Sequence, residues 1–224
     1  MTWLVGQLKL LGDILVSLLP AVPMTVAVVA LAYPMALTGG LCVAGLRISI
    51  RKWFSIPAQW YSDTLRGVPL LVQIFFIYFG LGKVLNLDRF VAGVAAIAFC
   101  YSAYLSEIFR AAILAIPKGQ HEAALSLGMT KWQVYIYVVL PQAFRIALPP
   151  MANEFTACLK DTSLVSIIGL RELTRATREY YSTYFVDFQT WLVAGGIYLI
   201  LNALATRSSA WVERRLSVPG LGGE

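Results

Sequence analysis

Charged residues interrupt several stretches of the chain that are otherwise almost entirely apolar. The five that stand deepest in such stretches are Glu107, Arg110, Glu154, Lys160 and Asp161. A charge at the centre of a membrane span costs on the order of 2.5–3.5 kcal/mol on insertion scales, so these side chains are expected to face protein or water. One interpretation is mutual neutralisation, with Glu107 paired to Arg110, and Glu154 paired to Lys160 or Arg145.

A second interpretation of the same charges is a site for a zwitterionic solute. Such a solute needs an acceptor for its ammonium group and donors for its carboxylate. The run Lys160-Asp161-Thr162-Ser163 offers both signs of charge and two hydroxyl groups within one helical turn. Upstream, the Pro149-Pro150 pair predicts a break that frees backbone groups beside this run, as in the broken helices of transporters.

The composition places much of the chain's surface in lipid. Of its 224 residues, 58% are hydrophobic and only 13% are charged, against about 25% charged in a soluble domain. In so apolar a chain the net charge of +6 indicates basic cytoplasmic loops rather than nucleic-acid binding. The three cysteines lie in apolar runs without paired spacing, and His121 is the only histidine. Neither a disulfide, a metal site nor a catalytic set is therefore predicted.

Long uncharged runs predict five membrane-spanning helices, and therefore an all-α membrane protein. The expected spans are residues 20–46, 66–85, 90–116, 142–170 and 188–206, with an interfacial segment at 53–65 and a polar segment at 171–187. Pro34 is expected to kink the first span. We expect residues 1–19 to form a lead-in, residues 20–215 a single transmembrane domain, and residues 216–224 a tail.

The distribution of lysine and arginine predicts an amino terminus outside and a carboxyl terminus inside the cell. Basic residues are more frequent in cytoplasmic loops than in external ones. Clusters of them follow the first span at residues 47–52 and the last span at residues 207–215. The expected outer side carries fewer: Lys9, Lys83, Arg89, Arg171, Arg175 and Arg178.

Between the third and fourth spans the sequence predicts two short helices, which we call the knuckle (residues 117–141). Pro117 suits the first turn of a helix, and Gly128 suits its end. Thr130 and Gln133 have the spacing of a capping box, which starts a second helix at Lys131. From spacing alone, the knuckle is either a helical surface loop or a helix that docks into a groove on another protein.

Several motifs together resemble one family. Glu122-Ala123-Ala124, then Gly128, then Leu140-Pro141 resembles the signature loop of bacterial ABC importer permeases, with Val138 standing where that family usually has Ile. Outside the knuckle, three further segments resemble the polar amino-acid branch of these permeases. They are Arg66-Gly-Val-Pro-Leu-Leu-Val-Gln73, Ser106-Glu-Ile-Phe-Arg110 and the segment from Asn153-Glu154 to Lys160-Asp-Thr-Ser-Leu164. The resemblance covers most of the chain.

The resemblance implies that the knuckle docks into an ATP-binding subunit and that polar residues of the later spans line a translocation path. The implied coupling residues are His121, Glu122, Ala123, Ala124, Leu125, Gly128 and Met129. In the path, Asp161 and Glu107 are expected to accept hydrogen bonds from an ammonium group or a basic side chain. Lys160, Asn153, Thr162 and Ser163 are expected beside them. Gln73 is a weaker candidate, for which an interhelical hydrogen bond is the alternative.

The resemblance also implies the partners. They are two ATP-binding cassette subunits, a second permease chain (the same or homologous), a periplasmic substrate-binding protein, an amino acid and the lipid bilayer. ATP and magnesium belong to the ATPase, so this chain is expected to bind no cofactor and to be no enzyme by itself. The acidic path residues mildly favour a basic amino acid or a derivative of one, whereas Lys160 is equally compatible with an acidic or neutral one. The alternative is a proton- or sodium-coupled carrier that uses Glu107 and Asp161, but it leaves the knuckle without a purpose.

Overall fold

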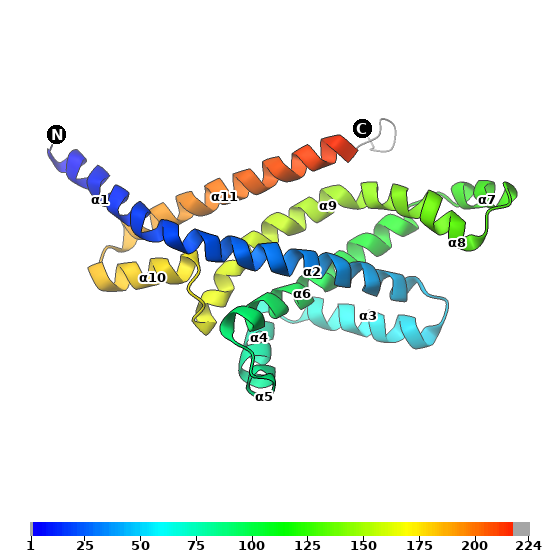
Figure 1. The fold of residues 1–224 in the computed structure, drawn as a ribbon, viewed down its shortest axis with the longest axis horizontal. Helices are drawn as coiled ribbons and strands as arrows, with labels where there is room; N and C mark the ends of the chain where they lie inside the picture. The colour runs from blue at the N-terminus through cyan, green and yellow to red at the C-terminus, as the bar shows by residue number, and fades with distance from the viewer. Residues whose placement is uncertain (1, 217–224) are drawn as a thin grey trace. The chain divides into compact units, whose positions relative to one another are not determined.

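The computed structural model describes residues 2–216, and side chains from Val5 to Arg215. Within that range every regular element is a helix, joined by short connections, which confirms the all-α prediction (Figure 1). In chain order the longer helices are α1 (Thr2–Leu18), α2 (Val22–Ile48), α3 (Lys52–Gly67), α6 (Arg89–Leu114), α9 (Leu140–Asp161), α10 (Leu173–Tyr184) and α11 (Asp187–Leu216). The shorter ones are η1 (Leu19–Ala21), α4 (Leu70–Phe75), η2 (Phe76–Leu81), α5 (Gly82–Leu85), α7 (Lys118–Ser126), α8 (Lys131–Gln133), η3 (Val134–Val139) and η4 (Thr162–Ile168).

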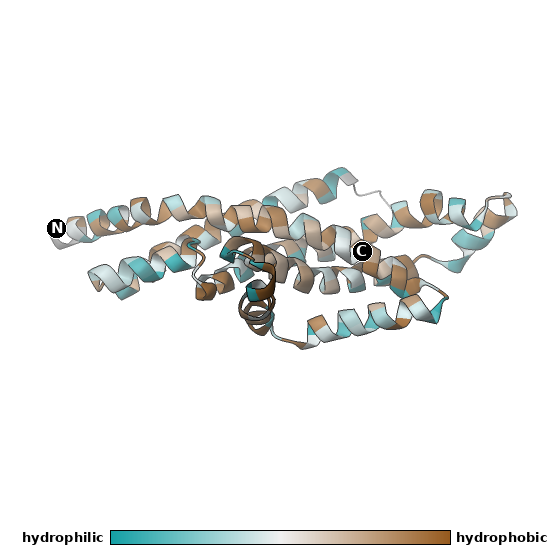
Figure 2. Ribbon diagram, turned by 60° about the horizontal axis from the view of Figure 1, so that its bottom comes forward, coloured by the Kyte–Doolittle hydropathy of each residue, from teal (hydrophilic) through white to brown (hydrophobic). Residues whose placement is uncertain are grey.

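Helix length and hydropathy identify four candidate membrane spans in the described residues, or five if the broken pair α3 and α4–α5 counts as one. The single spans are Val5–Ile48, Arg89–Leu114, Lys131–Ile168 and Asp187–Arg215. Hydrophobic residues predominate along these helices, whereas α10 is mostly hydrophilic (Figure 2). The prediction of five spans is consistent with this arrangement.

The chain divides into two compact units. Unit 1 comprises the chain up to Pro34, Pro69–Ala98 and Thr156–Ala205. Unit 2 comprises Met35–Val68, Phe99–Phe155 and the chain from Thr206. The long helices α2, α6, α9 and α11 each contribute residues to both units.

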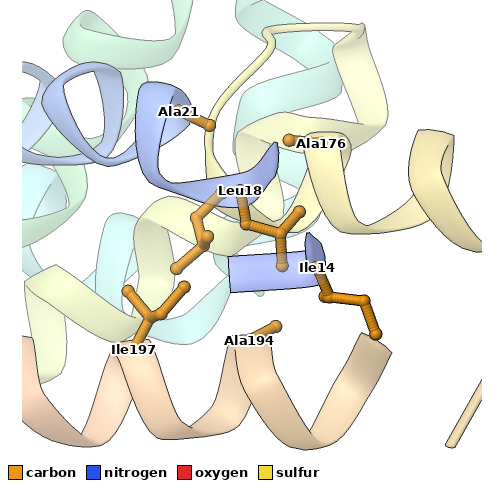
Figure 3. Packing of buried hydrophobic residues seen from close by; sticks show 7 residues of the cluster. Ile14, Leu18, Ala21, Ala176, Ala194 and Ile197 are labelled. Carbon is orange, nitrogen blue, oxygen red and sulfur yellow. The ribbon is translucent and has the colours of Figure 1, made fainter. Parts of the chain in front are cut away.

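Unit 1 has an apolar core where α1, η1, α10 and α11 meet. Ile14, Leu18 and Ala21 point toward Ala176 of α10 and toward Ala194 and Ile197 of α11 (Figure 3). The small alanines let the helices approach closely, and all of these side chains are buried. The first backbone N–H of α10, on Leu173, donates to Thr25 Oγ1 at 3.1 Å, so α10 is also tied to the first half of α2.

Unit 2 is built on a close contact between α2 and α6. A Cβ added to Gly40 would lie 2.8 Å from Leu105 Cβ and 3.1 Å from the Ser102 carbonyl oxygen, so only glycine fits this crossing. Helix α3 packs on α6 through polar side chains. Tyr61 Oη lies 2.6 Å from Ser102 Oγ, and Ser62 Oγ lies 3.2 Å from Ser106 Oγ.

The structure adds two helices that were not predicted and removes one predicted break. Helix α1 lies in the expected lead-in, and α10 lies in the polar segment 171–187. Helix α9 runs through Pro149 and Pro150 without the predicted break. Each proline lacks an N–H, so two hydrogen bonds are lost, but Ala147, Leu148 and Met151 are buried on either side and hold the helix. The expected tail lies, apart from Leu216, outside the described residues.

Candidate functional site

The first helix of the knuckle, α7, begins one residue later than predicted, because Pro117 itself has an extended backbone and serves as the N-cap. Its end is a Schellman motif: Met129 N donates to the Ala124 carbonyl at 3.2 Å, and Gly128 N donates to the Leu125 carbonyl at 3.0 Å. Gly128 has φ +80°, and a Cβ there would touch nothing within 4 Å. Glycine is therefore required at this position by backbone conformation and not by space.

The second helix of the knuckle starts as predicted but is not separate. Gln133 N donates to Thr130 Oγ1 at 3.3 Å, and Thr130 N donates to Gln133 Oε1 at 2.8 Å, which completes the capping box. Helix α8 then passes through the π-helical turn η3 directly into α9. The second knuckle helix and the fourth span were predicted as separate elements. They form one helical rod because no glycine or N-cap residue interrupts it after Gln133.

The knuckle presents an exposed surface of mixed polarity. Glu122, Ala123 and Leu125 of α7 are exposed, whereas Ala124 is buried. Leu127 and Trp132 are 84% and 74% exposed, which is unusual for apolar side chains of this size. The His121 ring packs edge-on against Tyr135, with 5.4 Å between the ring centroids, and so joins α7 to η3. The predicted coupling residues thus lie together on one short helix and its C-terminal turn.

Glu107 lies at the centre of an arginine cluster in unit 2. Its Oε2 accepts from Arg47 Nη2 at 2.6 Å and lies 3.4 Å from Arg66 Nη1. Its Oε1 accepts from Arg110 Nη2. The predicted pair of Glu107 with Arg110 is therefore present, together with two arginines that sequence spacing did not connect to it.

Arg47 is the most enclosed of these arginines, with a side chain only 3% exposed. Its other donors bond to Gln59 Oε1 at 3.0 Å and to Ser62 Oγ and Ser106 Oγ, both at 3.2 Å. Because α2, α3 and α6 all supply side chains to the cluster, the cluster holds these three helices together within unit 2.

The predicted path residues fall into two groups. Gln73, Lys160, Asp161, Thr162 and Ser163 belong to unit 1, and Glu107 and Asn153 belong to unit 2. Within unit 1, α4, which carries Gln73, contacts η4, which carries Thr162 and Ser163. Asp161 is the last residue of α9, at the point where the helix tightens to the 3₁₀ turn η4. Gln73 and Thr162 are buried, Lys160 and Asn153 are exposed, and Asp161 and Ser163 are half-buried.

Sequence reasoning did not single out the carboxylate of Glu172, which is fully buried at the N-cap of α10. It accepts from Thr174 N at 2.9 Å, from Arg175 N at 2.8 Å and from Tyr198 Oη at 2.9 Å. Burial raises the pKa of the Glu172 carboxyl, and the two backbone N–H groups oppose that rise. Glutamate is not among the residues preferred at an N-cap, so the sequence carried no local signal for this role.

Residues 36–218 match the family model for the inner membrane component of binding-protein-dependent transport systems. The chain belongs to this permease family. It is 37% identical over 191 residues to the glutamine transport system permease protein GlnP of Escherichia coli, covering 82% of this chain and 87% of the relative. It is 35% identical over 196 residues to the histidine/lysine/arginine/ornithine transport system permease protein HisQ of Escherichia coli, covering 82% and 86%. The expected resemblance to the polar amino-acid branch is confirmed.

A solved structure shows the same permease fold. A crystal structure of an amino acid ABC transporter with histidines superposes with a TM-score of 0.83 at 37% identity, covering 89% of this chain and 94% of that chain. The permease is accordingly a multi-pass inner-membrane transport subunit and not the catalytic subunit, and its family implies ATPase and binding-protein partners. Among the described residues no group of three or more His, Cys, Asp or Glu is arranged to hold a metal ion.

Proposed function

We propose that this permease couples ATP hydrolysis in a partner subunit to amino-acid import through the knuckle. The observation that carries this proposal is the exposed helix α7, which ends at Gly128 and is joined by His121 to the rod formed by α8, η3 and α9. A force applied to α7 reaches η3 through the contact between His121 and Tyr135. It then reaches α9, because α8, η3 and α9 are continuous. Exposed Leu125, Leu127 and Trp132 supply the apolar contact area that a docking helix needs.

The proposed translocation path is centred on Asp161, beside Lys160, Thr162 and Ser163. The helix type changes there, from α9 to η4, and such irregular backbone is typical of solute sites in transporters. Asp161 accepts the solute ammonium or a basic side chain, and Asn153 and Gln73 contribute from α9 and α4. For Glu107, three arginine partners support neutralisation as its main role, so its place in the path is the weaker part of the proposal.

A basic amino acid, or a derivative of one, is the proposed substrate. The relatives divide on this point, since GlnP is named for glutamine and HisQ for histidine, lysine, arginine and ornithine. A carboxylate in the path favours the basic amino acids.

The proposal includes the assembly and topology of the permease. The permease pairs with the same or a homologous chain and keeps its amino terminus outside and its carboxyl terminus inside. Residues 20–215 form its transmembrane domain.

Coupling is tested by co-purifying the complex after the substitution Glu122→Arg, with Glu122→Gln as the matched control. Glu122 is exposed on α7, so neither variant disturbs the core. Arginine should abolish ATPase co-purification or solute-stimulated hydrolysis, and glutamine should keep most of both. If Glu122→Arg retains full coupling, the knuckle is not the docking site.

The path is tested by uptake into proteoliposomes that contain the complete complex. Asp161→Asn should keep assembly and basal ATPase activity but lose most arginine uptake, whereas Lys160→Gln should lose less. Competition among arginine, lysine, histidine and glutamine then assigns the substrate class. Unchanged arginine uptake by Asp161→Asn contradicts the site, and uptake inhibited by glutamine alone contradicts the substrate class.

A further inference from the structure

Helix η4 carries two residues of the proposed path, Thr162 and Ser163, and follows directly on Asp161. A 3₁₀ helix has three residues per turn, so Thr162, Val165 and Ile168 lie on one face of η4. All three side chains are buried. Because the hydrogen bonds of a 3₁₀ helix are poorer than those of an α-helix, the position of η4 depends on the neighbours that hold this face.

Two contacts with α6 hold the middle and the C-terminal end of η4. A Cβ added to Gly93 of α6 would lie 3.1 Å from Val165 Cγ1, so the two helices approach closely at that point. Arg89 Nη1 donates to the carbonyl oxygen of Gly169, the C-cap of η4, at 3.4 Å. Both contacts lie away from the N-terminal end of η4, which is the end next to Asp161.

The N-terminal end of η4 meets Tyr198 of α11. The Tyr198 hydroxyl interacts with the side chain of Thr162, whose Oγ1 also donates to the Leu159 carbonyl at 2.7 Å. The same hydroxyl donates to Glu172 Oε2 at 2.9 Å and lies 2.8 Å from Thr174 Oγ1. A phenol oxygen donates one hydrogen bond and accepts two, so Tyr198 can meet all three of these side chains at once.

Glu172 is the fixed end of this connection. Its side chain is fully buried, and its two oxygens accept from two backbone N–H groups in the first turn of α10. Helix α10 in turn packs in the apolar core of unit 1. Tyr198 therefore connects a fixed point in α10 to Thr162, the residue that follows Asp161. All of these residues belong to unit 1.

We infer that Tyr198 is a positioning residue for the proposed solute site, because its hydroxyl links Glu172 to Thr162 and so fixes the turn that presents Asp161 and Ser163. It acts through Thr162 and needs no contact with the solute. Without the hydroxyl, η4 keeps its two contacts with α6, but its N-terminal end is free to shift. The inference rests on the proposed function, since a solute site at Asp161 is part of that proposal.

The test measures solute import per ATP hydrolysed in proteoliposomes that contain the complete complex. This ratio does not depend on how much of the complex folds, so a merely structural defect leaves it unchanged. Radiolabelled arginine is the probe, or glutamine if the wild-type complex prefers it. Tyr198→Phe should lower the ratio about two- to tenfold, which is the range that one hydrogen bond controls.

Tyr180→Phe is the matched control. It also removes a phenol hydroxyl beside the apolar core of unit 1, but this hydroxyl has no hydrogen-bond partner in the part of the chain that the structure describes. The ratio of import to hydrolysis should equal that of the wild type. An equal fall in Tyr180→Phe and Tyr198→Phe would overturn the inference, because the fall would then not depend on the link to Thr162.

A double-mutant cycle tests whether the Tyr198 hydroxyl acts through Thr162. Thr162→Val should lower the ratio as Tyr198→Phe does, and Thr162→Ser, which keeps the hydroxyl, should retain most of it. The two lowering substitutions together should be no worse than the more severe one alone, since both remove the same link. Independent effects that multiply would overturn the inference. If Tyr198→Phe fails to assemble, the comparison of Thr162→Val with Thr162→Ser decides alone, and equal ratios in these two variants would overturn it.

Asp161→Asn, measured alongside, separates this inference from the proposed function. If Asp161→Asn lowers the ratio and Tyr198→Phe does not, the positioning role is wrong and the proposed site stands. If Asp161→Asn keeps the wild-type ratio, the proposed site is wrong, and the inference about Tyr198 fails with it. A lowered ratio in all three of Asp161→Asn, Tyr198→Phe and Thr162→Val is the expected result.

Discussion

The two enclosed glutamates of this permease are stabilised in opposite ways. Glu107, in unit 2, is surrounded by the guanidinium groups of Arg47, Arg66 and Arg110. Glu172, in unit 1, forms no ion pair among the described residues and accepts instead from two backbone N–H groups and one tyrosine. The Glu107 carboxylate is thus stabilised by charged guanidinium groups, and the Glu172 carboxyl by the dipoles of uncharged N–H and O–H groups.

The position of each residue in its helix explains the difference. Glu107 lies inside α6, where the backbone N–H groups are already used by the helix, so only side chains can supply donors. Glu172 lies at the start of α10, where the first N–H groups have no partner within the helix. An enclosed carboxylate inside a helix therefore needs cations, whereas one at an N-terminus can be held by the backbone.

The largest effect is expected when the charge centre of the arginine cluster is removed. Glu107→Ala leaves three arginines without their shared carboxylate, and Arg47 is almost wholly enclosed. Breaking one side of a buried pair costs about 3–5 kcal/mol, and the 28% exposure of Glu107 places this case near the lower end. Thermal unfolding of the detergent-purified complex measures this loss of stability. The unfolding midpoint of Glu107→Gln is expected between those of the wild type and Glu107→Ala. An unfolding midpoint equal to wild type would show that the cluster contributes no stability.

A smaller effect is expected when one dipole is removed from Glu172. Tyr198→Phe deletes the hydroxyl that donates to Glu172 Oε2 at 2.9 Å and also contacts Thr174 Oγ1 at 2.8 Å. A hydrogen bond to a charged group contributes about 1.5–3 kcal/mol, so the variant should lose stability by that order at a pH above the raised folded pKa of Glu172, where the carboxyl is ionised. The loss should shrink at acid pH, where the carboxyl is neutral. A loss that does not change with pH would place the hydroxyl's main contribution at Thr174.

The pH dependence separates the two carboxylates directly. The pKa of Glu172 is raised above its ordinary 4.5 by burial, so the folded chain keeps a proton that the unfolded chain has already released. Stability from this group is complete below pH 4.5 and declines as pH rises to the folded pKa, by at most about 1.4 kcal/mol per pH unit. Glu172→Gln should remove this decline from the curve of unfolding midpoint against pH. The same decline in the glutamine variant would assign it to another group.

The sequence predicted what depends on local composition and spacing. Long uncharged runs located the spans, Gly128 located the end of α7, and Thr130 with Gln133 located the capping box, since each is decided by neighbouring residues. It did not predict contacts between distant segments. Arg47 reaches Glu107 across 60 positions, and Tyr198 reaches Glu172 across 26, so both depend on how helices pack.

The continuity of α9 was missed for a related reason. Proline is a local signal for a break, yet buried neighbours on both sides of Pro149 and Pro150 keep the helix intact. The path residues were chosen by residue type and resemblance, and the structure places Glu107 in a different unit from Asp161. Their shared role stays a prediction.

The smallest effect is expected at a third glutamate, Glu179. Like Glu107 it pairs with arginines, but it is more exposed than either Glu107 or Glu172. Glu179 pairs with Arg171 at 2.7 Å and Arg175 at 3.2 Å, but its side chain is 40% exposed. The hydrogen bond from Arg171 lowers the pKa of Glu179, so its contribution is present above pH 4.5 and is lost as pH falls through the folded pKa. Solvent and salt screen such a pair to less than about 1 kcal/mol. Glu179→Gln should therefore shift the unfolding midpoint slightly at low ionic strength and not at high ionic strength. A shift as large as that of Glu107→Ala would show that arginine count, and not burial, decides how much a carboxylate contributes.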